Sequence, residues 1–172
     1  MQMSKKAKKI WDGVTTALVV LVVLFAVFLM GSRLVGLRVF NVISGSMEPA
    51  YSVGDLLYVK EVDPDSVKVG DVITFVLNED LVVATHRVVA VDSENRQFTT
   101  KGDANGAEDA SPVHFNNLIG VPAFSIPLLG YVSVYIQSPP GLYVAIAFGV
   151  LLLAAVFLPD MMKKKPEQEE AK

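Results

Sequence analysis

Residues 37–49 read LRVFNVISGSMEP, and they separate a long apolar segment from turn-rich, β-like sequence. The first part, Leu37 to Ile43, is rich in β-forming residues, and the second, Ser44 to Pro49, predicts a tight turn at the end of a strand. Gly45 allows backbone angles that a Cβ forbids. Such a turn can present the hydroxyl of Ser46 to a substrate carbonyl, as a nucleophile requires. Short Ser/Gly/Pro segments are also ordinary turns, so the motif needs support from the rest of the chain.

Composition narrows the class of protein. Of 172 residues, 52% are hydrophobic, and the excess lies at the two ends, which favours membrane segments over an oversized core. The chain has no cysteine, and His86 and His114 are its only histidines, too few for an ordinary zinc site. We expect no metal or other cofactor. The net charge is −3 without a basic block outside the termini, so we expect no binding to nucleic acid.

The amino end predicts a transmembrane helix over residues 14–32, preceded by a basic cytoplasmic segment, residues 1–13. The apolar run from Val14 to Met30 is 17 residues long, close to the lower limit for crossing a bilayer. A cleaved signal peptide would begin in the same way. Cleavage of a signal peptide needs small residues at the first and third positions before the cut. In each of the candidate pairs Leu29/Gly31, Met30/Ser32 and Leu34/Gly36, a large residue occupies the third position. A retained anchor is the better interpretation.

The carboxyl end predicts a second transmembrane helix, residues 141–159. Pro139-Pro140-Gly141 breaks the chain, a second apolar run extends from Leu142 to Leu158, and Lys163-Lys164-Lys165 follows. Basic clusters beside membrane helices stay in the cytoplasm. Both termini are therefore predicted to lie on the cytoplasmic side of the cell membrane, and residues 33–140 on the outer side. That central part carries seven Lys/Arg and thirteen Asp/Glu, a balance of −6. The polar tail, residues 160–172, is predicted to be cytoplasmic and disordered.

The central part predicts antiparallel β structure. Candidate strands are residues 56–62, 72–77, 81–91 and 96–100, and the second and third form a hairpin around Asn78-Glu79-Asp80. Residues 101–117 are polar and predict a loop. Residues 119–135 are apolar but contain Pro122 and Pro127, so we expect irregular β structure near the membrane, since interior prolines cost a helix about 3 kcal/mol each.

A nucleophilic serine needs a base and a group that orients the base. His86 lies in the second strand of the predicted hairpin, and Asp103 and Asp109 lie in the loop that follows. Each residue also has an interpretation without catalysis. His86 could be a solvent-facing histidine of a strand, and the aspartates could belong to a surface Asx turn. His114 has no motif around it, and we interpret it as a loop residue.

Together these segments form an ordered series. It comprises Ser44 to Pro49, Gly54-Asp55, Gly70-Asp71-Val72-Ile73, Thr85-His86-Arg87-Val88 and Lys101-Gly102-Asp103-Ala104-Asn105 with Asp109. The series resembles the type I signal peptidases, in particular the archaeal and endoplasmic-reticulum branch, over roughly Val39 to Gly130.

The resemblance implies roles for five residues. It implies Ser46 as the nucleophile and His86 as the base, where the bacterial branch has lysine. The family's conserved aspartates fall on Asp103 and Asp109. Ser44 matches an oxyanion-hole serine of the bacterial branch. Because Asp103 stands in a Gly-Asp-Ala-Asn turn, we expect it to support the loop and Asp109 to orient His86.

The resemblance also implies a fold and a reaction. The fold is a mainly β, coiled antiparallel sheet flanked by the two membrane helices. The reaction is hydrolysis of the bond between a signal peptide and its secreted protein, with preproteins and the lipid bilayer as partners and a secretion translocon as a further candidate. Two alternatives stay open: a non-catalytic membrane-anchored β-domain, and a serine peptidase of related fold with a different processing or self-cleaving role.

Overall fold

The computed structural model describes residues 4–77 and 82–161, and the chain divides into two compact units. One unit takes in the described residues of Met1–Leu29 and Ser138–Lys172, and the other is Met30–Gln137. The first contains helices and the second contains the sheet. The predicted hairpin turn at residues 78–80, the cluster at residues 163–165 and the tail beyond it lie outside the described residues.

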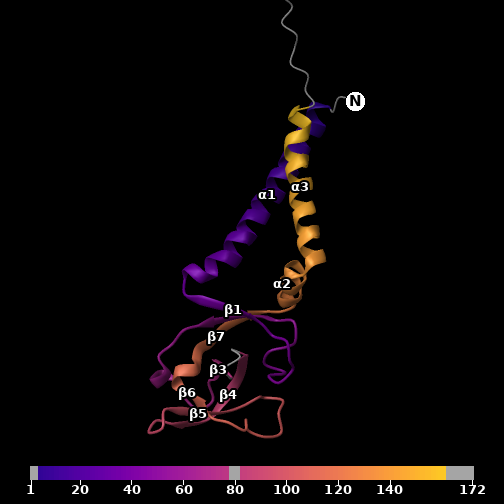
Figure 1. The fold of residues 1–172 in the computed structure, drawn as a ribbon. Coiled ribbons are helices and arrows are strands. Elements are labelled where there is room, and N and C mark those ends of the chain that lie inside the picture. The colour runs from indigo at the N-terminus through magenta and orange to yellow at the C-terminus, as the bar shows by residue number, and fades with distance from the viewer. Residues whose placement is uncertain (1–3, 78–81, 162–172) are drawn as a thin grey trace, which may run out of the picture. The chain divides into compact units, whose positions relative to one another are not determined.

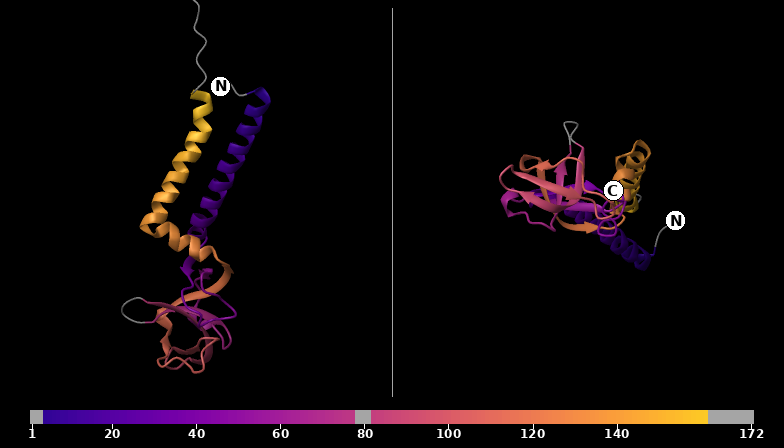
Figure 2. Two further views of the ribbon diagram at one scale, coloured as in Figure 1. Left: turned by 90° about the vertical axis from the view of Figure 1, so that its right-hand side faces the viewer. Right: turned by 90° about the horizontal axis from the view of Figure 1, so that it is seen from below.

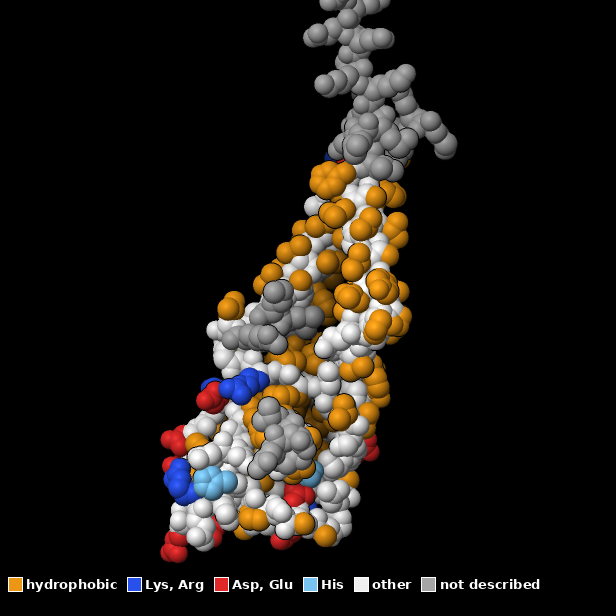
Figure 3. Space-filling view, viewed as in Figure 1, with side chains coloured by type: hydrophobic (Ala, Val, Ile, Leu, Met, Phe, Trp, Pro, Cys, Tyr) orange, Lys and Arg blue, Asp and Glu red, His pale blue; other side chains and the backbone are white. Residues whose placement is uncertain are grey.

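The helical unit contains most of α1 (Lys5–Leu34) and all of α3 (Pro139–Met161). Within them, Lys6–Val27 and Pro139–Phe157 are long and apolar enough to cross a membrane, each with a mean hydropathy of 2.3. The N-terminal end of α1 lies beside the C-terminal end of α3, where Trp11 Nε1 donates a hydrogen bond to Ala155 O at 3.0 Å (Figure 1). Hydrophobic side chains cover both helices, whereas charged side chains gather on the β-rich unit (Figure 3).

Both helices begin earlier than the apolar runs alone predicted. The basic segment before residue 14 continues the first helix back to Lys5. The third helix begins at Pro139 itself, although the prediction treated Pro139-Pro140-Gly141 as a break. Proline is tolerated there because the first turn of a helix has no intrahelical use for the backbone N–H that proline lacks.

The second unit is built on one seven-stranded antiparallel sheet, in the order β1-β2-β7-β3-β4-β5-β6. The strands are β1 (Leu37–Asn41), β2 (Leu56–Lys60), β3 (Val72–Val76), β4 (Val83–Asp92), β5 (Gln97–Lys101), β6 (Val113–His114) and β7 (Leu118–Ile126). Shifts of register interrupt the β2–β7, β3–β7 and β4–β5 pairs. Such bulges increase strand twist, and the sheet curls on itself (Figure 2). The predicted fold class, a coiled antiparallel sheet with two long apolar helices, is confirmed.

Apolar side chains on the inner surface of the curl form the core. One cluster joins β3, β4 and β5 to the segment around β6 through Ile73, Phe75, Val88, Phe98 and Phe115, all at most 2% exposed. A second cluster, Leu57, Val59 and Ile119, joins β2 to β7. Strands β2 and β3 both begin after a Gly-Asp pair in which the aspartate accepts a backbone N–H three residues upstream. The donors are Ser52 N for Asp55 and Lys68 N for Asp71.

The expectation of irregular β structure over residues 119–135 is wrong in its second half. Strand β7 ends at Ile126, and a helix, α2 (Leu129–Gln137), follows. Pro122 lies in the strand and Pro127 precedes the helix, so neither imposes the penalty for an interior proline. Gly130 lets α2 approach the turn before β2, where its N–H donates to Gly54 O at 2.9 Å.

The loop predicted for residues 101–117 also contains regular structure. His114, expected to be a loop residue, pairs with Gln97 in the short strand β6. It then caps a 3₁₀ turn (Phe115–Asn117), because its Nδ1 accepts the N–H of Asn116 at 3.1 Å. Residues 102–112 remain without a strand or helix.

Candidate active site

Ser46 lies in the turn that follows β1. Backbone hydrogen bonds from Glu48 N to Gly45 O and from Tyr51 N to Met47 O close the turn. Met47 is buried, with 2% of its surface exposed, so the residue after Ser46 anchors the turn in the core. Gly45 does not have a positive φ here, contrary to the sequence argument. The turn leaves the side chain of Ser46 at the surface, half-buried.

His86 extends from strand β4, where it pairs with Ile73 of β3. Its Nε2 is 3.2 Å from Ser46 Oγ, across 40 residues of sequence. The side chain is 14% exposed. The buried ring of Phe75 meets the imidazole edge-on, with ring centroids 6.2 Å apart. The strand and this aromatic contact hold the ring toward the serine.

Asp109 lies on the other side of the imidazole. Its Oδ2 is 2.6 Å from His86 Nδ1, and the same oxygen accepts a hydrogen bond from Thr100 Oγ1 at 2.6 Å. An ionised carboxylate can only accept, so this contact fits the tautomer of His86 that carries its hydrogen on Nδ1. Nε2 of the neutral ring is then the acceptor for the hydroxyl of Ser46. The hydroxyl of Ser46 therefore faces the ring nitrogen that can accept its proton, and Asp109 holds the opposite ring nitrogen.

Asp103 occupies a different position. Both of its carboxylate oxygens accept from Arg87, at 2.8 Å and 2.6 Å, and Arg87 also donates to Gly70 O at 2.7 Å. The hydrogen bonds from Arg87 hold the pKa of Asp103 below its ordinary value, against a smaller opposing effect of desolvation. The same hydrogen bonding raises the pKa of Arg87. Arg87 follows His86 on β4, so this ion pair ties the loop to the strand that carries the histidine.

The loop also contacts the turn that carries Ser46. The N–H of Ala104 donates to Ser46 O at 2.9 Å. A Cβ at Gly102 would lie 2.7 Å from the same oxygen, closer than atoms of real side chains approach. A side chain at this position would push the two segments apart.

Ser44 lies beside the nucleophile candidate. Its Oγ is 3.3 Å from Ser46 Oγ, and either hydroxyl can donate. Ser44 is exposed, so its hydroxyl is free to meet a group that approaches Ser46 from solvent. A donor within reach of the attacked carbonyl is what an oxyanion hole requires.

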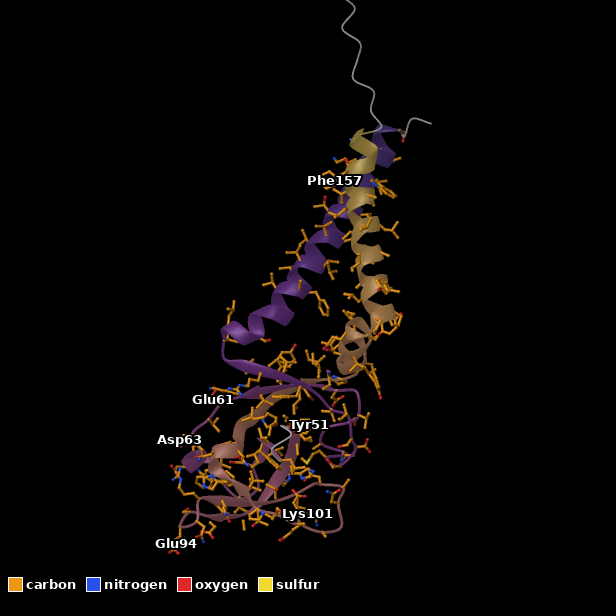
Figure 4. The ribbon with its side chains drawn as sticks, in the orientation of Figure 1. Tyr51, Glu61, Asp63, Glu94, Lys101 and Phe157 are labelled. Atoms are coloured by element: carbon orange, nitrogen blue, oxygen red, sulfur yellow. The ribbon has the colours of Figure 1, made fainter. Side chains whose placement is uncertain are left out.

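A cavity of about 520 Å³ opens beside these residues. Residues 40–43, at and after the end of β1, form one wall, and residues 82–86, at the start of β4, form another. Met47, Tyr51 and Leu57 complete the lining, and Ser46 and His86 lie on it. Tyr51 lies in the middle of the β-rich unit (Figure 4). Its pKa is raised, mainly by burial, so its hydroxyl stays neutral at ordinary pH.

The structure thus brings Ser44, Ser46, His86 and Asp109 together and places Asp103 on Arg87. His114 is bonded elsewhere, to Asn116. Sequence reasoning missed the roles of Thr100, Arg87 and Gly102. Arg87 and Gly102 stood inside the quoted motifs, but Thr100 carried no signal. Within the described ranges, no group of three or more potential metal ligands occurs.

The chain is similar to known signal-peptide-processing enzymes. Residues 14–101, about half of the chain, match the signal peptidase, peptidase S26 family. Signal peptidase I W of Bacillus subtilis (strain 168) is 42% identical over 86 residues, 48% of this chain and 45% of the relative. The signal peptidase complex catalytic subunit SEC11 of Candida albicans is 34% identical over 107 residues, 56% of this chain and 64% of the relative.

A mammalian relative is similar over a comparable stretch. The signal peptidase complex catalytic subunit SEC11C of Canis lupus familiaris is 29% identical over 109 residues, 58% of this chain and 57% of the relative. The chain therefore spans between about half and two thirds of the length of these three relatives. The family match includes Ser46 and His86 and ends before Asp103 and Asp109.

Proposed function

Because the chain belongs to the signal peptidase family, peptidase S26, we propose that it is a membrane-bound serine endopeptidase that removes signal peptides from secreted preproteins. The observation that carries the mechanistic part is the contact between Ser46 Oγ and His86 Nε2 at 3.2 Å, with Asp109 on the opposite ring nitrogen. A pair this close is what transfer of a proton from a serine nucleophile to a histidine base requires.

In the proposed first step, Ser46 Oγ attacks the scissile carbonyl and its proton passes to His86 Nε2. The carbonyl oxygen gains negative charge, and Ser44 donates to it. When the tetrahedral intermediate collapses, the C–N bond breaks and His86 gives its proton to the leaving amine of the mature protein. The signal peptide is then held as an ester on Ser46.

In the second step, water loses a proton to His86 Nε2 and attacks the ester. Collapse of the second tetrahedral intermediate releases the signal peptide with a new carboxylate and returns the proton to Ser46. Asp109 stays ionised throughout and stabilises the imidazolium that forms in each step. Asp103 supports the loop and takes no proton.

The substrate is proposed to bind as an extended strand in the cavity. Among the described residues β1 is the end strand of the sheet and pairs with β2, so its other edge is the one to which we propose that a further strand adds. The cavity wall beside it ends at Ser44 and Ser46. An extended peptide adding to this edge gains backbone hydrogen bonds, and the apolar walls suit small uncharged side chains.

The two long apolar helices support a membrane location. We propose residues 14–32 and 141–159 as membrane spans, with residues 1–13 and 160–172 in the cytoplasm and residues 33–140 outside the cell membrane. In that arrangement the catalytic unit meets preproteins whose signal peptides are already in the bilayer, where a translocon could deliver them.

The test compares variants of the purified full chain in detergent with a preprotein as substrate. Wild type should release a shortened product, whereas Ser46→Ala and His86→Ala should release none and unfold at the wild-type temperature. The double variant should be no worse than either single one, because the two side chains act as a unit.

Two matched variants serve as controls. Ser93→Ala changes an exposed serine in the β4–β5 turn, and His114→Ala changes the other histidine; both should cleave as wild type does. Substantial cleavage by Ser46→Ala would refute the serine mechanism. A shortened chain without cleavage of the preprotein would instead support the self-cleaving alternative.

A further inference from the structure

Asp109 lies in a segment that makes little contact with the hydrophobic core. Of residues 103–112, all are exposed except Asp109 itself. Such a segment does not hold one carboxylate at 2.6 Å from an imidazole by packing, because it contributes no side chain to the core. The position of Asp109 must come from specific hydrogen bonds.

Thr100 supplies two of these bonds. Its carbonyl oxygen accepts the N–H of Asp109 at 2.8 Å, and its Oγ1 donates to Asp109 Oδ2 at 2.6 Å. The first bond fixes the backbone of Asp109, and the second fixes the carboxylate. Thr100 itself is 0% exposed, so a rigid part of the core holds both contacts.

The sheet places Thr100 and His86 on the same face. Thr100 of β5 pairs with Val88 of β4, and His86 lies two residues before Val88. Cross-strand partners and residues two apart share a face of the sheet. His86 and Thr100 therefore lie on the same face of the paired strands β4 and β5. In Figure 4 the label Glu94 locates the β4–β5 turn, and the label Lys101 locates the end of β5.

Resting on the proposed function, we propose that Thr100 is a positioning residue that holds Asp109 against His86. Since the carboxylate oxygen can only accept, the buried hydroxyl of Thr100 is a donor to it. Two donors, Thr100 Oγ1 and His86 Nδ1, then meet at Oδ2. Loss of the threonine hydroxyl frees the carboxylate to rotate and weakens its hold on the Nδ1–H form of the ring.

The test uses two substitutions at Thr100 and a control on the adjacent residue. Thr100→Val removes the hydroxyl and keeps the branched shape, whereas Thr100→Ser keeps the hydroxyl. Thr99→Val removes a hydroxyl from the opposite face of the same strand. We expect Thr100→Val to lower kcat by about 10- to 100-fold, the size of one lost hydrogen bond to a charged group, with KM within about twofold. Thr100→Ser and Thr99→Val should stay within about threefold of wild type.

A second readout does not depend on cleavage. The chain has two histidines with opposite expected tautomers, because His86 Nδ1 faces a carboxylate and His114 Nδ1 accepts an N–H. In the full chain with isotope-labelled histidine, ring-nitrogen NMR should show a slowly exchanging Nδ1–H for His86 in wild type, Thr100→Ser and Thr99→Val. That signal should weaken in Thr100→Val, and His114→Gln assigns it.

The outcomes separate this proposal from the proposed function. If wild type cleaves no preprotein, the proposed function fails, and the NMR comparison still tests Thr100. Unchanged kcat in Thr100→Val, or an unchanged His86 signal, would overturn the positioning role. If Thr100→Val does not fold, Thr100→Ala takes its place. Failure of both to fold would assign the hydroxyl to stability instead and overturn the proposal as well.

Discussion

At the scale of the residue, the site depends on which atoms of each side chain can donate a hydrogen bond and which can only accept one. Asp109 can only accept, so His86 must donate from Nδ1 and accept at Nε2. The hydroxyl of Ser46 then has His86 Nε2 as an acceptor at 3.2 Å, and Ser44 Oγ is its other neighbour at 3.3 Å. The proposed tautomer of His86 thus follows from the carboxylate, and it leaves Nε2 as the acceptor that the proposed role of Ser46 requires.

Replacing Asp109 tests this chain of dependence. In Asp109→Asn the amide can donate to Nδ1 and favours the wrong tautomer, so kcat should fall by up to about 10⁴-fold while the thermal unfolding transition stays near that of wild type. Steady-state kinetics and a melting curve measure the two effects. If Asp109→Asn stays active and Asp103→Asn is inactive with an unchanged melting curve, the two assignments must be exchanged.

Replacing Ser44 tests the oxyanion donor. Ser44→Ala should lower kcat by roughly 10²- to 10³-fold with little change in KM, the size expected for one lost donor. Ser44→Thr keeps a hydroxyl and should be milder. Equal losses in the two variants would point to packing in the turn rather than to donation.

At the scale of the element, the segment of residues 102–112, most of which are exposed, connects the parts of the site. It contacts β5 through Thr100, β4 through the Arg87–Asp103 pair, and the turn of Ser46 through the N–H of Ala104. Ser46, His86 and Asp109, the proposed nucleophile, base and orienting carboxylate, belong to three segments that are distant in sequence. Their relative positions therefore depend on how firmly this one segment is attached.

The Arg87–Asp103 pair gives this attachment a pH dependence. The pKa of Asp103 is lower in the folded chain than in the unfolded chain, because Arg87 donates to the ionised form. Its stabilising contribution is therefore fully present above the ordinary aspartate pKa, about 4, and is lost as the pH falls through the lower folded value. Asp103→Asn should unfold at a lower temperature than wild type at pH 7, and this difference should shrink below about pH 4.

Thermal unfolding measured between about pH 7 and pH 3 checks this expectation. Asp92→Asn is a useful comparison, because Asp92 also has a lowered pKa but bonds mainly to Asn95, far from the site. Activity at pH 7 should fall in Asp103→Asn and stay unchanged in Asp92→Asn. A Tm difference for Asp103→Asn that is constant down to pH 3 would contradict a charge-dependent role for the pair.

At the scale of the whole molecule, the chain joins a helical unit with two candidate membrane spans to a β-rich unit that carries the site. The helical unit takes in described residues from both sides of the β-rich unit in the sequence. If both helices cross the bilayer, the termini must share one side and the β-rich unit the other. The basic clusters near the ends are the reason for proposing that the termini lie in the cytoplasm.

Thiol labelling can determine this topology, because the chain has no cysteine of its own. Ser93→Cys places a single thiol in an exposed turn of the β-rich unit, and Ser4→Cys places one before α1. In intact cells, a membrane-impermeant thiol reagent should label Ser93→Cys, and it should label Ser4→Cys only after the membrane is opened. Labelling in the opposite order would reverse the proposed orientation.

Much of this protein follows from local sequence pattern. The two apolar runs predict two long helices because length and hydropathy alone decide whether a segment can cross a bilayer. Alternating β-formers between turn residues predict the strands on either side of residues 78–80. The candidates Ser46, His86 and the two aspartates are visible because only a few residue types can act as nucleophile, base or orienting group.

The tertiary structure alone decided which of these candidates lie together. Asp103 and Asp109 are six residues apart in one polar segment. The turn sequence around Asp103 favoured Asp109 as the orienting group, but it did not identify the partner of either carboxylate. Their different partners, Arg87 and His86, lie on a strand that pairing brings beside the segment. The contact of Thr100 could not be predicted for the same reason. The sequence of a buried strand does not indicate which acceptor the hydroxyl of a threonine will bond. These contacts depend on closure of long loops, which the sequence specifies only through the fold as a whole.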